Sequence, residues 1–365
     1  MRAAFPVEFM HSFKLCCLCL AAILFGLAPA RAANEGTFRI ADWTGRAYFK
    51  EKDKKQKERE FDRCSAQMTN PDRISIIYSL DRHFMWTFEL SSEAWNFPKG
   101  SSFEVAFGSG TGAHFRQRVA ALEPQLLRVL LPDSINSFET FRRLVRLELV
   151  AGGLTTRFDT AYANLVLTAL TKCVTRYGST PRSRAAIAAF LKSPIGPASA
   201  PSSDPAILTE TAELAKSLVA EANLPKAESL KPANVPDGMP GDAVWKIADA
   251  YMTVSVLPRE HVPSEIGDLT DLIVGADAQK CRGDFFSGTT LDLIDAVNVA
   301  RAYTNCETQQ ATSSIHYLLM PRAQGGLYLI RSIISGVEVT PVGERAVKEL
   351  DAKIRGSIMA ALAKM

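Results

Sequence analysis

Four cysteines remain in this chain once its N-terminal segment is set aside as an export signal. Lys14 precedes an apolar run from Leu15 to Leu27, and Ala30-Arg31-Ala32 supplies the small-x-small pattern that signal peptidase cleaves. Residues 1–32 are therefore predicted to be a signal peptide. Exported proteins meet an oxidising compartment, where thiols form disulfides. A periplasmic or secreted protein with a covalently cross-linked fold is expected.

The order of the cysteines along the chain favours one pairing. Four cysteines allow three connectivities, and spacing alone does not choose among them. A Pro/Ala/Ser-rich stretch from Pro194 to Pro205 separates the first two cysteines from the last two. If each half closes on itself, Cys64 pairs with Cys173 and Cys281 pairs with Cys306. No C-x-x-C motif occurs among these four cysteines, so a zinc ribbon or a thioredoxin-type centre is not expected, and neither a metal site nor a cofactor is assigned.

The apolar run Leu15–Leu27 is shorter than the roughly 20 residues that a membrane helix needs. No other stretch approaches that length, so no transmembrane span is expected after processing, although a retained anchor stays the alternative. The net charge is only +3, which gives no reason to expect nucleic acid as a partner.

Length and composition indicate two globular domains. The chain has 365 residues, of which 47% are hydrophobic and 22% charged. We expect an N-terminal α+β domain over residues 36–180, a linker with one helix over 181–242, and a C-terminal α+β domain over 243–365. The fold class expected is α+β, with an antiparallel sheet and a C-terminal helix in each domain.

The clearest strand signal lies between Ile74 and Leu90. Apolar residues alternate with polar ones on both sides of Asp81-Arg82-His83, which predicts an antiparallel hairpin. Thr37–Tyr48 and Val244–Val256 are each predicted as one strand. Ile-Ala-Asp occurs in both of these segments, but three residues do not indicate a duplication.

Helices are predicted from the spacing of apolar residues and from capping residues. Asp204 precedes Pro205 at the start of a helix that runs to Asn223. Asp159 or Thr160 caps a second helix, whose apolar face carries Cys173 towards the sheet. A terminal helix begins at Pro341. The segment Asp292–Ala302 fits either a strand or a helix.

Few residues point to catalysis. Acyl transfer needs a nucleophile, a base and an orienting acid. Among the four histidines of the mature chain, His114 is the best catalytic candidate, because it follows the loop Gly108–Gly112 and neighbours Ser109 and Thr111. His83 is expected to be solvated in its turn, and His316 to alternate away from Ile315 and Tyr317. No G-x-S-x-G elbow, P-loop or dinucleotide fingerprint occurs, so no catalytic residue is assigned.

A binding surface is the alternative use of the aromatic residues. Trp95-Asn96-Phe97-Pro98 follows a predicted strand and is expected to be exposed. Trp95, Phe97 and His114 therefore form a candidate surface for an envelope protein or a glycan. Core packing is the competing interpretation of the tryptophans, because indole rings bury large areas.

An ordered set of residues resembles an uncharacterised secreted module of alphaproteobacteria, which is found alone or attached to trypsin-like protease domains. The resemblance covers residues 37–177 and rests on Trp43-x-Gly45-x-Ala47-Tyr48, Phe61-x-x-Cys64, Trp86, Trp95 and Leu170-x-x-Cys173-Val174. It implies an envelope location and no activity. The chain has no Gly-Asp-Ser-Gly motif, so no protease residue can be carried over.

These observations predict a non-enzymatic binding or structural protein of the envelope. A periplasmic hydrolase with a site near His114 is one alternative. An accessory protein or inhibitor of an extracytoplasmic protease is the other, and it depends on the resemblance alone.

Overall fold

The computed structural model describes residues 36–50, 60–108, 114–130, 141–142, 144–151, 154–178, 181–192, 201–224, 226–236, 239, 241–262, 265–294, 297–336 and 341–363. The predicted signal peptide and residues 109–112 of the glycine loop lie outside these ranges. None of the described helices is long and apolar enough to span a membrane.

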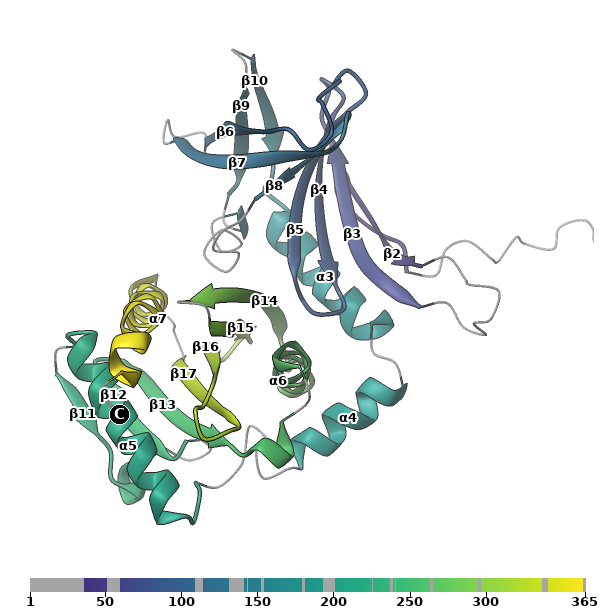
Figure 1. The fold of residues 1–365 in the computed structure, drawn as a ribbon. Helices are drawn as coiled ribbons and strands as arrows, with labels where there is room; N and C mark the ends of the chain where they lie inside the picture. The colour runs from purple at the N-terminus through teal and green to yellow at the C-terminus, as the bar shows by residue number, and fades with distance from the viewer. Residues whose placement is uncertain are drawn as a thin grey trace, which may run out of the picture. The chain divides into compact units, whose positions relative to one another are not determined.

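The first sheet contains ten antiparallel strands in the order β1-β2-β3-β4-β5-β8-β7-β6-β9-β10 (Figure 1). The predicted hairpin is confirmed, because β4 pairs with β5 and Ile76 lies opposite Leu90. The strands are β1 Phe38–Ile40, β2 Trp43–Phe49, β3 Phe61–Thr69, β4 Ile74–Asp81, β5 Trp86–Ser92, β6 Ser102–Gly108, β7 His114–Glu123, β8 Leu126–Val129, β9 Arg146–Ala151 and β10 Leu154–Asp159.

This sheet curls, so that its last strand, β10, approaches the turn between β3 and β4. The Asn70 side chain, in the turn between β3 and β4, donates to Thr156 Oγ1 on β10 at 2.6 Å. Helix α3 (Ala163–Tyr177) packs against β2, β3 and β4. A disulfide joins Cys64 on β3 to Cys173 on α3, with the Cα atoms 6.2 Å apart. This is the pair that the sequence favours.

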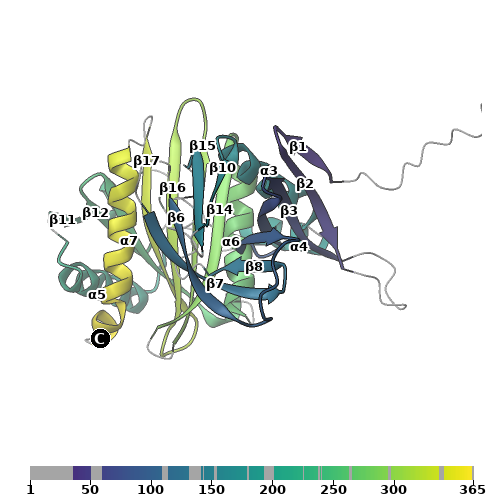
Figure 2. The ribbon, with the colours of Figure 1, turned by 90° about the horizontal axis from the view of Figure 1, so that it is seen from above.

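The second sheet contains seven antiparallel strands in the order β11-β12-β13-β17-β16-β15-β14. The strands β14 to β17 stand between helix α6 on one side and helix α7 on the other (Figure 2). Helix α5 packs on α7, β12 and β13. The bounds are β11 Ala227–Ser229, β12 Ala243–Ile247, β13 Ala250–Leu257, β14 Asp284–Ile294, β15 Val297–Glu307, β16 Thr312–Pro321, β17 Leu327–Gly336, α5 Pro205–Glu221, α6 Ile266–Lys280 and α7 Pro341–Leu362.

Two predictions of single strands are wrong for the same reason. Thr37–Tyr48 forms the hairpin β1–β2, and Val244–Val256 forms the hairpin β12–β13. Both turns are an Ala-Asp pair whose alanine has a positive φ, 50° at Ala41 and 52° at Ala248. Alanine in this left-handed region is uncommon, so the usual Asn-Gly or Asp-Gly turn signal is missing.

Three further expectations needed correction. The helical alternative for Asp292–Ala302 is wrong, since the segment belongs to β14 and β15. The short Ala-rich helix that the sequence also allows over Ser183–Ser193 is confirmed as α4 (Pro181–Leu191), so the described part of residues 181–242 holds two α-helices, and strand β11 was not expected there. Tyr162, and neither Asp159 nor Thr160, is the N-cap of α3. The Asp204 cap of α5 is confirmed, because its Oδ1 accepts from Ala206 N.

The two sheets share buried contacts. Trp86 Nε1 on β5 donates to the Ser287 carbonyl on β14 at 2.6 Å. Thr289 N donates to the Phe84 carbonyl at 3.1 Å. One apolar cluster includes side chains from both sheets. The α+β class with antiparallel sheets is confirmed, whereas the division into two domains stays a prediction.

Candidate functional site

A pocket of about 300 Å³ lies between α6 and one face of the second sheet. We call it the α6 pocket. Its wall is mostly apolar, with a small group of buried polar side chains among the lining residues. Pockets of this type are the usual binding sites of small molecules. The lining residues are Phe190, Ile273, Asp277, Lys280, Cys281, Phe285, Thr304, Cys306, Ser313, Ile315, Tyr317, Arg331 and Ile333.

The register of the sheet places these residues on one face. Tyr317 on β16 lies opposite Arg331 on β17. Two residues away along each strand, Ile315 lies opposite Ile333. Since side chains alternate between faces of a strand, both pairs point to the α6 side. The polar and the apolar part of the pocket therefore lie on adjacent cross-strand residue pairs, or rungs, on one face of the sheet.

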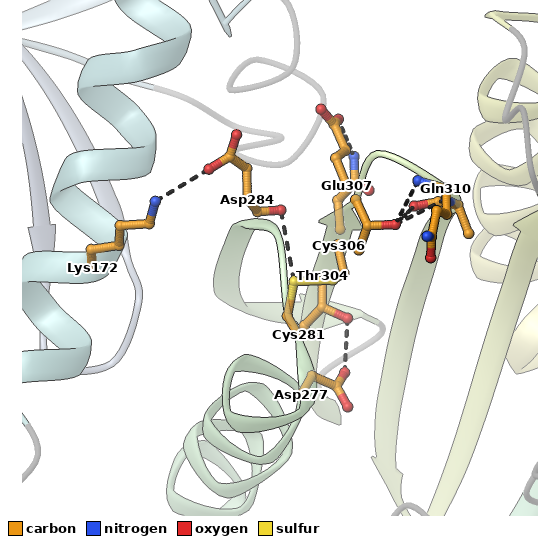
Figure 3. Close-up of a disulfide and its surroundings, with 11 residues drawn as sticks. Lys172, Asp277, Cys281, Asp284, Thr304, Cys306, Glu307 and Gln310 are labelled. Atoms are coloured by element: carbon orange, nitrogen blue, oxygen red, sulfur yellow. Dashed lines mark hydrogen bonds and ion pairs between the residues drawn. A yellow bond between two sulfur atoms is a disulfide. The ribbon is translucent and has the colours of Figure 1, made fainter.

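Helix α6 is held over this face by a covalent bond. Cys281, directly after the helix, is linked to Cys306 on β15, and the two Cα atoms are 5.7 Å apart (Figure 3). Helix α4 approaches α6 closely at Gly275, where a Cβ would lie 2.7 Å from Ile187 Cδ1. The small residue lets α4 approach α6, and the disulfide ties the end of α6 to β15.

Asp277 on α6 is the acidic group of the pocket. Its Oδ2 accepts hydrogen bonds from Tyr317 Oη at 2.5 Å and from Thr304 Oγ1 at 2.8 Å. Figure 3 shows the bond from Thr304 beside the disulfide. Burial raises the pKa of Asp277, while the two hydroxyl donors act in the opposite direction. Among the described residues, no group donates a hydrogen bond to its Oδ1.

Tyr317 is a permanent donor in this network. Its side chain is 3% exposed. Burial, and then the neighbouring carboxylate of Asp277, raise the pKa of Tyr317 well above its ordinary value. The phenol therefore stays protonated and keeps Asp277 Oδ2 occupied.

Arg331 is the buried basic group of the pocket, and Lys280 is a second, exposed one. Arg331 is 4% exposed, and its Nη1 donates to Ser255 Oγ at 3.2 Å. Burial lowers its pKa, and Tyr317 and Asp277 oppose that effect. Within the described part of the chain, its Nε and Nη2 donate to no protein group. A guanidinium with two donors unused is suited to a carboxylate.

The pocket therefore holds an acid and a base that face the same space without touching. Both residues belong to the described part of the chain, and Asp277 forms no ion pair with Arg331. Buried charges are costly unless each has a partner. The arrangement can bind a polar or charged group and an apolar body at once.

No set of three His, Cys, Asp or Glu side chains suited to a metal ion occurs among the residues that the structure describes. A second hollow, of about 470 Å³, lies at the ends of β3, β4 and β5. All of its lining residues are polar, namely Gln67, Thr69, Arg73, Ser75, Ser91, Ser92, Glu93 and Gln125.

The structure does not bring the predicted binding residues into the α6 pocket. The Trp95 and Phe97 rings are 5.7 Å apart, edge to face, and Phe97 packs on Phe103 at 4.9 Å. Trp95 and Phe97 are partly buried against the apolar core. His114 begins β7, and its side chain lies outside the described set. The binding surface formed by these three residues stays a prediction.

Two other histidines have acidic neighbours. His83 was expected to be solvated, but its Nδ1 lies 2.5 Å from Asp271 Oδ2 on α6. His316 does alternate away from Tyr317, and its Nδ1 lies 3.8 Å from Asp351 Oδ2 on α7. Neither histidine lines the α6 pocket.

Sequence reasoning missed every polar residue of the α6 pocket. One signal was available for Asp277, which precedes Cys281 by four residues and so shares its helix face. No local signal marks Arg331, because its position depends on the pairing of β16 with β17.

Comparisons of the chain with protein-family models, with curated proteins and with solved structures found no match.

Proposed function

We propose that this chain is a periplasmic or secreted binding protein that holds a small molecule in the α6 pocket and does not transform it. The single observation behind this proposal is the pair Asp277 and Arg331. Each keeps polar atoms unpartnered, among the described residues, in a pocket with apolar walls. Such a combination of apolar lining, convergent polar groups and perturbed pKa values is typical of binding sites.

The location is supported by the two disulfides, which persist in oxidising compartments. The signal pattern of residues 1–32 points the same way. An envelope protein or glycan as a further partner, a hydrolytic site near His114, and a role as protease accessory or inhibitor stay alternatives that no described contact favours.

The test is a thermal-shift screen of the oxidised protein against a chemically diverse set of small molecules. At least one compound should raise the melting temperature of the wild type. Ser313→Trp, which fills the pocket from a partly exposed position on β16, should abolish the shift. Gln67→Trp in the polar hollow is the matched control and should leave the shift unchanged.

Two outcomes contradict the proposal. One is a screen without any shift in the wild type. The other is a shift that persists in Ser313→Trp, which places binding elsewhere. Mass spectrometry of the bound compound after incubation should return it unchanged, and a product would show that the protein is an enzyme.

A further inference from the structure

In the α6 pocket, Asp277 and Arg331 each use only part of their hydrogen-bonding capacity within the described part of the chain. Asp277 Oδ2 receives two hydroxyl hydrogen bonds, and Arg331 Nη1 is bonded to Ser255. Asp277 Oδ1 and Arg331 Nε and Nη2 have no partner among the described residues. Arg331 is almost fully buried and Asp277 is partly buried, and an unpartnered hydrogen-bonding group is more costly the more it is buried and charged. The open sides of both charges therefore define the chemistry of the ligand.

The apolar part of the pocket lies at a fixed distance from these charges. Ile315 and Ile333 form the rung next to Tyr317 and Arg331 on the same sheet face. Two residues along a strand correspond to about 7 Å. A ligand that reaches both rungs must have a charged end and an apolar end separated by a few bonds.

We infer that the ligand is a small zwitterion with an apolar side chain, of the class of the free α-amino acids. Its ammonium group is held by Asp277 Oδ1, its carboxylate by Arg331, and its side chain by Ile315 and Ile333. This inference rests on the proposed function of the same pocket. The carboxylate fits the planar fork of a guanidinium, which binds it with two parallel hydrogen bonds.

The volume of the α6 pocket and the charges of its side chains exclude chemically related classes of ligand. The pocket, of about 300 Å³, is at the lower limit of ordinary ligand sites, which suits one amino acid and not a long peptide. An amine without a carboxylate leaves Arg331 unmatched, and a carboxylate without an amine leaves Asp277 unmatched. A site built to bind a polar group strongly rejects analogues that lack it.

The experiment is calorimetric titration of the oxidised full chain with matched compounds. The probes are L-leucine and L-phenylalanine. The controls are 3-methylbutylamine, which is leucine without its carboxylate, 4-methylpentanoate, which is leucine without its ammonium group, and glycine, which lacks the side chain. We expect at least one of the two probes to bind at one site. Each control should bind at least 10-fold more weakly.

Variants connect this selectivity to the residues. Asp277→Asn should weaken binding of the amino acid at least 10-fold and leave 4-methylpentanoate unchanged. Asp268→Asn is the matched control, because it removes the same charge from an exposed position of α6 that does not line the pocket. It should change affinity less than 3-fold. Ser313→Trp, which alters no charged residue, gives the same test through steric block if Asp277→Asn does not fold.

The outcomes separate this inference from the proposed function. If a singly charged analogue binds as tightly as the amino acid, the zwitterion is overturned while a small-molecule site remains. The same holds if neither amino acid binds but another compound from the diverse set does. If nothing binds the wild type, both statements fail.

Discussion

His83 Nδ1 lies 2.5 Å from Asp271 Oδ2 and joins the tip of the β4–β5 hairpin to α6. The same tip is fixed by Thr289, whose Oγ1 donates to the His83 carbonyl. Hairpin β4–β5 belongs to the first sheet, whereas α6 covers the second. The pair therefore connects the two halves of the fold beside the helix that forms the α6 pocket.

Stability should depend on pH through this pair. The hydrogen bond to Asp271 raises the pKa of His83, with burial opposing it. Asp81 adds to the rise, and Arg82 lowers the pKa. A group whose pKa is raised in the folded state stabilises it below the ordinary histidine value, about 6.5. That contribution is lost as the pH rises through the raised pKa.

His83→Gln should therefore lower the free energy of unfolding by about 0.5–1 kcal/mol at pH 6, the range for a partly exposed ion pair. The difference between variant and wild type should shrink at pH 9. Urea unfolding at both pH values measures it. A difference of equal size at the two pH values would show that protonation of His83 contributes nothing.

How much of this fold the sequence predicts depends on where each signal lies. Helix α5 was predictable because its cap, Asp204, and its first residue, Pro205, are local. The β4–β5 hairpin was predictable because its alternation is regular on both sides of a polar turn. In each case a few neighbouring residues carry all of the information.

The turns at Ala41 and Ala248 could not be predicted in the same way. A two-residue hairpin turn usually shows glycine or asparagine where φ is positive. Here alanine takes that conformation, and pairing across the turn pays for it. Tertiary structure therefore decides the local conformation at these turns, and no glycine or asparagine marks them in the sequence.

The candidate site was harder still. Asp277 is on a helix, Tyr317 on one strand and Arg331 on the next, so only strand register and helix docking bring them together. The sequence alone does not show which residues of the helix lie against which residue pair of the sheet.

A glycine at the contact between the sheets provides a second prediction. A Cβ at Gly288 would lie 2.6 Å from Tyr303 Cε1 and 3.1 Å from Trp86 Cδ1. Gly288→Ala should lower the free energy of unfolding by about 1–3 kcal/mol, the usual cost of overpacking. Gly336→Ala is the control, since nothing lies within 4 Å of its Cβ position, and it should change stability by less than about 0.5 kcal/mol. Equal effects on chemical unfolding would contradict close contact at Gly288.

The hydrogen bonds of Glu210 on α5 lead us to expect that the folded protein loses stability in acid. Arg322 donates to it from Nε at 2.6 Å and from Nη2 at 2.5 Å, and Tyr328 Oη donates as well. The hydrogen bonds from Arg322 lower the pKa of Glu210, which burial opposes. A carboxylate whose pKa is lowered by folding stabilises the folded state at pH values above the ordinary glutamate pKa. That stabilisation is lost as the pH falls through the lowered pKa.

Glu210→Gln should therefore cost about 1–2 kcal/mol at pH 7, where the charged hydrogen bonds are complete. The cost should diminish below about pH 4, near the ordinary glutamate pKa, as the wild-type carboxylate becomes protonated. Glu213→Gln, an exposed position on the same helix, is the control and should have little effect at either pH. A cost that grows in acid would reverse the assigned direction of the pKa shift.

The two disulfides should differ in what their removal changes. Cys64–Cys173 spans 109 residues and Cys281–Cys306 spans 25, so loop-closure entropy predicts losses of about 5 and about 3.5 kcal/mol for the paired serine variants. Denaturant unfolding of each variant measures the losses.

Only Cys281 and Cys306 line the α6 pocket, so their replacement should also abolish the ligand-induced thermal shift. The Cys64→Ser/Cys173→Ser variant should keep that shift at temperatures where it remains folded. A wild-type melting temperature that excess dithiothreitol leaves unchanged would show that neither bond contributes, because a reduced chain regains the entropy that each closed loop removes.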